Sequence, residues 1–213
     1  MKDKIVVYQA IMGGRDNFYP PAYLPDDVDH FTIVGQGDKN PLDAAKKFKI
    51  LPHRYFREYD ISVWMDGNYQ LTGDIREVVN RFMDKADWAV LRHPAENLKI
   101  IPSVYREAEV AIMQKVVKPD AMKRQMESYR KEGLPKGSEV VMNSIIIRRH
   151  NKPKIIKFDE AWWRELNRFT MRDQISFPYL AWKYRLKYVK LNNIEFMADW
   201  FLFRPHTKER MKI

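Results

Sequence analysis

Residues 62–68 read SVWMDGN, and the interpretation of the whole chain depends on them. An apolar run ends there abruptly on an acid, a glycine and an amide. Because Asp-Gly and Gly-Asn are among the commonest turn dipeptides, Asp66, Gly67 and Asn68 taken alone favour a tight turn. The alternative is that the carboxylate of Asp66 and the amide oxygen of Asn68 hold a hard divalent cation such as Mg²⁺ or Mn²⁺.

The sequence around this stretch alternates between short apolar strands and amphipathic helices. One helix follows Asp74, an N-cap residue, because apolar side chains then recur at helical spacing through Phe82. The alternation is typical of an α/β fold with a mostly parallel central sheet flanked by helices. We expect strands at residues 4–9, 30–35, 61–65, 88–91, 144–148 and 187–191, and helices at 44–48, 52–59, 75–82, 104–131 with a break at Pro119, 155–168 and 174–184.

The length and composition of the chain limit the possible classes of protein. A chain of 213 residues without a linker or repeat fits one domain, residues 1–213. It has no cysteine, so any metal must be held by oxygen or imidazole. It has no signal peptide and no apolar run long enough to span a membrane, so we expect a cytoplasmic protein. The net charge of +10 predicts anionic partners: nucleic acid, a membrane surface or a phosphorylated small molecule.

The position of Asp66 in this pattern favours a ligand site over a simple turn. In open α/β sheets, ligands bind beyond the carboxyl ends of the strands. Asp66 directly follows the expected strand at residues 61–65, so its side chain should emerge at that edge. Gly67 lets the backbone turn and approach a ligand closely.

Four blocks of the sequence resemble GT-A glycosyltransferases. They read YQAIMGGRDNF at residues 8–18, AKKFKILPHRYFREYDISVWMDGN at 45–68, SIIIRRHN at 144–151 and MRDQISFPYLAW at 171–182. More narrowly, they are similar to a glycosyltransferase-like family of plants, bacteria and large algal viruses, long catalogued as a domain of unknown function, and to a chlorella-virus glycosyltransferase domain. The resemblance implies a single Rossmann-like GT-A domain, with the nucleotide sugar bound by about residues 1–92 and the acceptor by about 93–213.

The resemblance also implies a metal site at the end of the third strand. The acidic motif of the family, written DxD, holds a divalent ion against the diphosphate of a sugar nucleotide. Asp66 and Asn68 occupy its two positions, and Asn68 weakens the negative charge of the site. A C-terminal histidine often completes such a site, which makes His206 a candidate ligand, although a solvated basic tail explains it as well. The implied cofactor is Mn²⁺ or Mg²⁺, of which Mn²⁺ suits imidazole better.

Residues on both sides of the acidic motif are candidates for binding the donor. Cations that precede the third strand can neutralise a leaving diphosphate, which is the main demand of glycosyl transfer, but a solvated helix face explains them equally well. The turn after the first strand borders the nucleotide in a GT-A fold, and a plain turn is its alternative interpretation. The implied donor site consists of Gln9, Ala10, Ile11, Arg15, Lys46, Lys49, Arg54, Asp66 and Gly67.

The block around Asp173 is the candidate for the reacting end of the site. Asp173 stands at an expected helix start, where it can act simply as an N-cap. The functional interpretation places Asp173 and Gln174 beside the reacting sugar. There Asp173 is a general base in an inverting enzyme, whereas in a retaining one it stabilises an oxocarbenium-like transition state or orients the acceptor. The resemblance of Asp173-Gln174 favours a retaining enzyme. Glu139 and His93 are candidates for the acceptor side, with a structural role as the alternative for each.

Three classes of function stay open on the sequence. The first is a hexosyltransferase-type glycosyltransferase that moves a sugar from a UDP-sugar to a glycan or glycoprotein. The second is a nucleic-acid-binding module, which the net charge of +10 and 13% aromatic residues support without a recognisable motif. The third is a metal-dependent nuclease or phosphotransferase, which needs more clustered carboxylates than Asp66 has near it. The expected core holds most of the tryptophans, and the candidates for a sugar-stacking platform are Trp162, Trp163, Trp182 and Trp200.

Overall fold

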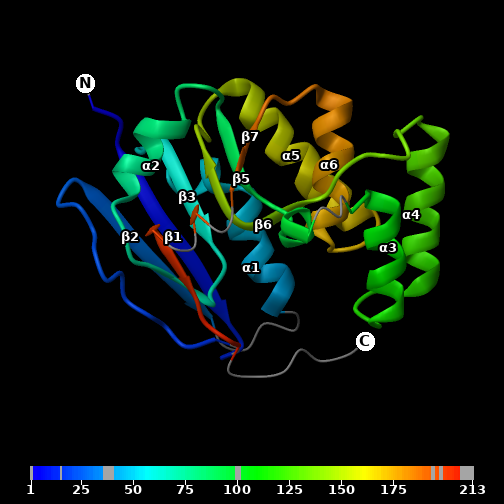
Figure 1. The fold of residues 1–213 in the computed structure, drawn as a ribbon, viewed down its shortest axis with the longest axis horizontal. Coiled ribbons are helices and arrows are strands. Elements are labelled where there is room, and N and C mark those ends of the chain that lie inside the picture. The colour runs from blue at the N-terminus through cyan, green and yellow to red at the C-terminus, as the bar shows by residue number, and fades with distance from the viewer. Residues whose placement is uncertain are drawn as a thin grey trace.

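The structure is a central sheet with helices on both faces (Figure 1). The computed structural model describes residues 2–14, 16–35, 41–98, 102–192, 195–196 and 199–206. Among these, no helix is both long and apolar enough to cross a membrane. The main elements are β1 (Ile5–Met12), β2 (Val28–Gly35), α1 (Pro41–Ile50), β3 (Ile61–Met65), β4 (Tyr69–Leu71), α2 (Ile75–Phe82), β5 (Trp88–Arg92), α3 (Val104–Met113), α4 (Pro119–Lys131), β6 (Val141–Arg148), α5 (Pro153–Arg168), α6 (Asp173–Tyr184), β7 (Val189–Leu191) and β8 (Phe201–Phe203).

The six-stranded sheet has the order β2-β1-β3-β6-β5-β7. Strand β1 is parallel to β2 and β3, and β5 is parallel to β7. Strand β6 runs antiparallel to both of its neighbours, β3 and β5. The other five strands therefore point the same way, which confirms the expected mostly parallel sheet. Their carboxyl ends and the amino end of β6 lie along one edge.

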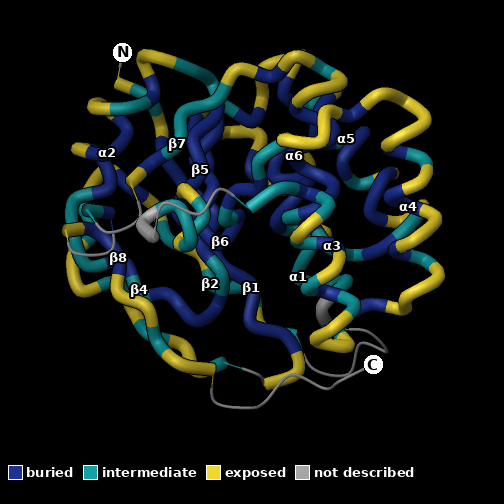
Figure 2. The backbone as a smooth tube through the Cα atoms, turned by 45° about the vertical axis from the view of Figure 1, so that its right-hand side comes forward, coloured by how far each residue is buried: buried dark blue, intermediate teal, exposed yellow. Residues whose placement is uncertain are grey.

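The two faces of the sheet carry separate hydrophobic cores, because successive side chains of a strand point to opposite faces. On β1, Val6 and Tyr8 belong to the core under α1, α3, α4, α5 and α6. Ile5 and Val7 belong to the core under α2 and the antiparallel pair of β4 and β8. Figure 2 shows the central strands as the most deeply buried part of the chain.

Two regions differ from the sequence-based expectation. The helix expected at residues 52–59 is only a 3₁₀ turn at Pro52–Arg54, because Phe56 and Tyr59 are drawn into the core against Tyr8 and Phe31. A second, two-stranded sheet of β4 and β8 was not expected. Both of its strands have three residues, which is too short for a periodic signal to stand out. The expected break at Pro119 separates α3 from α4.

A buried ion pair joins β6 to the helical layer. The guanidinium of Arg148 donates to Asp159 Oδ1 at 2.9 Å, and both side chains are fully buried. It also donates to the hydroxyl of Tyr8 at 3.2 Å and to the backbone carbonyl of Lys49, and it stacks 4.8 Å from the Trp88 ring centroid. One side chain therefore links β6, α5, β1 and the end of α1.

Replacing Arg148 with methionine should destabilise the protein strongly. The substitution leaves the Asp159 carboxylate buried without its cation, and breaking a buried pair in this way costs about 3–5 kcal/mol of unfolding free energy. Urea denaturation measures this change. Arg106→Met is the matched control, because it removes an exposed arginine paired with Glu109, with an expected loss of less than about 1 kcal/mol. Equal losses in the two variants would contradict the structural role of Arg148.

Gly73 lies where the backbone after β4 packs closely against the segment that leads into β8. A Cβ atom on Gly73 would overlap the backbone carbonyl of Asp199 and lie 2.6 Å from Trp200 Cδ1. Gly73→Ala should therefore push the segment that leads into β8 away from β4, with a loss of about 1–3 kcal/mol in urea denaturation. Gly137→Ala is the control, because a Cβ atom there meets nothing within 4 Å. A neutral Gly73→Ala variant would show that the two segments do not pack as closely as described.

Candidate functional site

Asp66 emerges from the carboxyl end of β3, at the edge where the sequence places it. Its backbone N–H donates to the carbonyl of Ser144 on β6 at 2.8 Å. The indole N–H of Trp64 donates to Asp66 Oδ1 at 2.8 Å. The Asp66 side chain is nevertheless 38% exposed. The carboxylate is thus oriented by the strand and still open to a ligand.

A buried ammonium group joins Asp66 to Asp173. Lys49, near the end of α1, places Nζ 3.1 Å from Asp66 Oδ1 and 2.7 Å from Asp173 Oδ2, and its side chain is only 5% exposed. Lys46, about one helical turn earlier, lies 2.8 Å from Asp173 Oδ1. The structure thereby brings together four residues that the sequence predicts as site residues: Lys46, Lys49, Asp66 and Asp173, which we call the charge cluster.

The charge cluster shifts the ionisation of its own members. Burial raises the pKa of Asp173, but the ammonium groups of Lys46 and Lys49 lower it more, so this pKa lies far below the usual carboxylate range. Burial lowers the pKa of Lys49, but Asp173 and Asp66 raise it more, and the net shift is upward. Asp173 is therefore a carboxylate at neutral pH and a weak base. Its first position in α6 also suits a negative charge, because helix N-termini favour anions.

The end of β1 and Asp16, a few residues beyond it, lie directly against Gly67. A Cβ atom at Gly67 would lie 3.2 Å from Ile11 Cγ1, 3.2 Å from Asp16 Oδ2 and 3.4 Å from the carbonyl of Ala10. This close approach explains why a glycine separates Asp66 from Asn68. Ala10 and Ile11 are thus placed beside the acidic turn, as the resemblance implies. Gln9 is fully buried and donates to Thr32 on β2 at 3.1 Å, so it contributes to the sheet.

The C-terminal segment returns to the same turn. The backbone N–H of Arg204 donates to the carbonyl of Asn68 at 2.8 Å, and His206 Nδ1 lies 2.5 Å from Asp16 Oδ1. His206 is thereby brought next to Gly67, through Asp16. The sequence-based interpretation did not choose Asp16, although it follows the Gly13-Gly14 turn and lies in the same sequence block as Gln9, Ala10, Ile11 and Arg15. Asn68 is 4% exposed as a residue, in contrast to the open carboxylate of Asp66.

The donor atoms in this region suit only one kind of metal site. Within the described part of the chain, no group of three or more His, Asp or Glu side chains is arranged to hold a metal. Asp66 does offer one accessible carboxylate. An ion such as Mg²⁺ is commonly held by one or two carboxylates together with substrate phosphates and water, and the residues present fit that arrangement. They do not fit a site made wholly of protein ligands.

The remaining candidates are placed differently. Arg54 forms a two-point pair with Glu160 on α5, at 2.8 and 2.7 Å, so its charge is already compensated outside the charge cluster. Gln174 follows Asp173 and accepts a hydrogen bond from Arg172 at 2.9 Å. Arg15 lies outside the described residues. His150 is fully buried, with Nε2 2.8 Å from the carbonyl of Phe56, and therefore has a structural role.

Comparison with known proteins identifies two relatives in Arabidopsis thaliana. The chain is 32% identical over 139 residues to the probable hexosyltransferase MUCI70, an alignment that covers 61% of this chain and 23% of the relative. It is 27% identical over 166 residues to the alkaline ceramidase TOD1, which covers 73% of this chain and 35% of the relative. The chain therefore spans only about a quarter to a third of the length of these relatives.

Solved glycosyltransferases have a similar fold. The apo structure of the bifunctional glycosyltransferase WbbM has a TM-score of 0.50 and 9% identity, covering 90% of this chain and 39% of that chain. A glycosyltransferase involved in the glycosylation of the major capsid of PBCV-1, a chlorella virus, has a TM-score of 0.47 and 7% identity, covering 98% of this chain and 94% of that chain. The mixed α/β architecture of the described residues, a six-stranded sheet with six α-helices, is thus shared with the first of these structures.

The family comparison covers the charge cluster itself. Residues 38–202 match the family described as TOD1/MUCI70, glycosyltransferase-like domain. This span contains Lys46, Lys49, Asp66 and Asp173, and it ends before His206. The chain belongs to the TOD1/MUCI70 glycosyltransferase-like family.

Proposed function

We propose that the protein transfers a sugar, a hexose in the first instance, from a nucleoside-diphosphate sugar to a hydroxyl group of a glycan or glycoprotein. A UDP-sugar is the first donor to test. The observation that carries this proposal is the bridge that Lys49 makes between Asp66 and Asp173. It joins the edge of the sheet where a nucleotide sugar would bind to the start of α6. Family membership supports the same reaction class.

The charge cluster supplies the electrostatics that this reaction needs. As the glycosidic bond to the diphosphate breaks, negative charge grows on the leaving group and positive charge grows on the sugar. Lys46 and Lys49 are cations held in place for the leaving group. A divalent ion on Asp66 would act as a Lewis acid on the same diphosphate. The carboxylate of Asp173 can face the cationic sugar.

The state of Asp173 favours a retaining reaction within this proposal. An inverting enzyme would use Asp173 to take the proton of the acceptor hydroxyl. Efficient general bases have a pKa near the working pH, whereas two ammonium groups keep the pKa of Asp173 far below its usual range. Stabilising the transition state or orienting the acceptor requires only a fixed negative charge. Gln174 adds an amide beside it for orienting a hydroxyl.

The similarity to a protein named alkaline ceramidase makes amide hydrolysis of ceramide a second candidate. Hydrolysis would require a general base or an activated nucleophile in the site. Asp173 is paired with two ammonium groups, which makes it a weak base, and Asp66 Oδ1 already accepts hydrogen bonds from Lys49 and Trp64. The geometry therefore favours transfer, and a ceramide assay on the same preparation separates the two activities.

Donor binding should depend on Asp66. We expect UDP-sugars with Mn²⁺ to raise the melting temperature of the wild-type protein, since a ligand at a hundred times its Kd adds about 2.7 kcal/mol of stability. Asp66→Ala should abolish the part of this shift that depends on Mn²⁺, and Asp173→Ala should keep it while transfer falls about a hundredfold or more. Asp60→Ala, at the opposite end of β3, is the control.

The same thermal-shift experiment discriminates between the classes of function. If UDP-sugars leave the melting temperature unchanged and single-stranded oligonucleotides raise it in a salt-sensitive manner, the protein is a nucleic-acid-binding module. Full transfer activity in Asp66→Ala would contradict the assignment of Asp66 to the donor and metal.

Removing Lys49 should change how transfer depends on pH. Lys49 is one of the two cations that lower the pKa of Asp173, and burial opposes them by raising it. Lys49→Met should therefore move the acidic limb of the pH–rate profile to higher pH and reduce the maximal rate. Lys47→Met, an exposed lysine on the same helix, is the matched control and should leave the profile unchanged. An unmoved acidic limb in Lys49→Met would show that Asp173 does not govern the reaction.

A further inference from the structure

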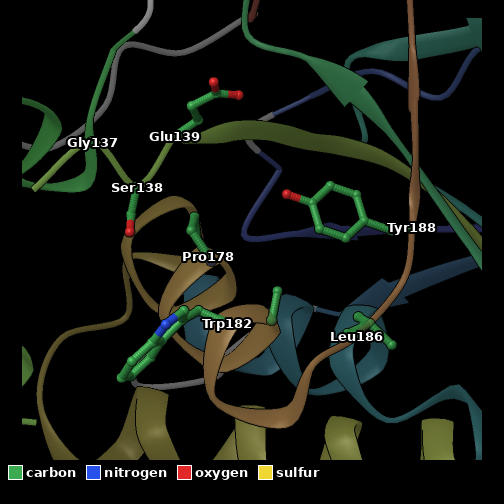
Figure 3. A pocket seen from close by; sticks show the side chains of 8 residues that line it. Gly137, Ser138, Glu139, Pro178, Trp182, Leu186 and Tyr188 are labelled. Carbon is green, nitrogen blue, oxygen red and sulfur yellow. The ribbon is translucent and has the colours of Figure 1, made fainter. Parts of the chain in front are cut away.

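A cavity outside the charge cluster has lining groups that the proposed reaction leaves unused. It has a volume of about 370 Å³ and lies between the second half of α6, the loop before β6 and the segment that enters β7 (Figure 3). None of the four residues of the charge cluster lines it. The lining residues that matter here are Ser138, Glu139, Pro178, Trp182, Leu186 and Tyr188, which we call the α6 cavity.

The α6 cavity combines an aromatic surface with free polar groups. Trp182 is 40% exposed, unlike the buried Trp88, Trp162 and Trp200. Figure 3 shows the Tyr188 hydroxyl pointing in from one side of the cavity, with the Trp182 ring on another. In the described part of the chain, neither the Tyr188 hydroxyl nor the Trp182 indole N–H has a hydrogen-bond partner. These groups can therefore receive a ligand without breaking an existing hydrogen bond.

The charge balance of the cavity favours an uncharged ligand. Glu139 is already paired with Lys190, and Lys190 also lies 3.8 Å from Glu96. A phosphate in the cavity would face the carboxylate of Glu139, which lines it, and be repelled. An acyl chain would cover Tyr188, Ser138 and Glu139 without satisfying their hydrogen-bonding groups, which is unfavourable. A pyranose ring fits both demands, because its C–H face packs on an aromatic ring while its hydroxyl groups bind polar neighbours.

Two rigid elements connect the α6 cavity to the charge cluster. Gln174, Pro178 and Trp182 are spaced by four residues, so they lie along one stripe of α6 that starts next to Asp173. At 1.5 Å per residue, Gln174 and Trp182 are roughly 12 Å apart along the helix. On the other wall, Glu139 stands two residues before β6, the strand whose Ser144 carbonyl receives the Asp66 N–H. This separation corresponds to an oligosaccharide of a few units.

We propose that the α6 cavity is a distal subsite that binds a sugar unit of an oligosaccharide acceptor, with Trp182 as the stacking platform. The reacting end of that acceptor lies at Asp173 and Gln174. This inference rests on the proposed function, because it assumes that the protein transfers sugar to a glycan. It adds that the enzyme selects acceptors longer than a disaccharide.

A glycan array tests the subsite without a donor. The probe is an array that carries oligosaccharides from disaccharides to hexasaccharides, incubated with wild-type protein, Trp182→Ala, Trp182→Phe and Tyr23→Ala. Wild-type protein should bind a longer glycan, and Trp182→Ala should weaken that binding about tenfold, the loss typical of an aromatic contact. Trp182→Phe should recover part of it. Tyr23→Ala removes an equally exposed aromatic side chain elsewhere and should bind as wild type.

The outcomes separate this inference from the proposed function. Circular dichroism and a thermal melt first show that Trp182→Ala is folded. Binding of no glycan by the wild-type protein, or equal binding by Trp182→Ala, overturns the distal subsite. The thermal shift with UDP-sugars does not depend on Trp182. If UDP-sugars do not raise the melting temperature, the proposed reaction is overturned, whereas the binding of carbohydrate in the α6 cavity is not affected by that result.

Discussion

The site depends on the ion pairs that the buried ammonium group of Lys49 forms with Asp66 and Asp173. A charged group loses its hydration when it is 5% exposed, and two carboxylates compensate for that loss. One carboxylate belongs to the end of β3 and the other to the start of α6. The charge of Lys49 therefore holds together two elements that neither share a hydrogen-bonded ladder nor follow each other in the chain. Without the ammonium group of Lys49, no cation would bridge the carboxylates of Asp66 and Asp173, and these would repel each other.

Lys49 is itself held at its backbone by a second buried ion pair. Its carbonyl accepts a hydrogen bond from Arg148, whose guanidinium is paired with Asp159 and also reaches Tyr8. The inner strand β6 thus makes two supporting contacts, one from its middle and one from its last residue. Ser144 holds the backbone of Asp66, and Arg148 holds the end of α1. Because both contacts come from one strand, the acid and the cation of the site are fixed in the same frame.

The charge cluster is balanced, with two ammonium groups and two carboxylates, whereas the chain as a whole carries +10. The excess positive charge lies elsewhere and can attract an anionic donor from solution. Within the cluster, the two ammonium groups give Asp173 a fixed charge rather than a proton-transfer role. This property separates a site for electrostatic stabilisation from a site for hydrolysis by a general base.

The sequence alone determined the class of the fold and indicated the four residues of the charge cluster. The strands and helices were predictable because apolar periodicity and N-cap residues such as Asp74 act locally. Lys46, Lys49, Asp66 and Asp173 were chosen from their motifs, and the tertiary structure decided that they are in contact, since Lys46 and Asp173 are 127 residues apart. Arg54 carried the same charge as Lys49, but its turn directs it to Glu160. Asp16 was not selected, because only folding places it against the acidic turn and His206. Gln174 and Trp182 were candidates on the sequence, but only the tertiary structure shows that Trp182 lines a cavity. Local patterns report which element a residue belongs to, whereas long-range packing decides which charges meet.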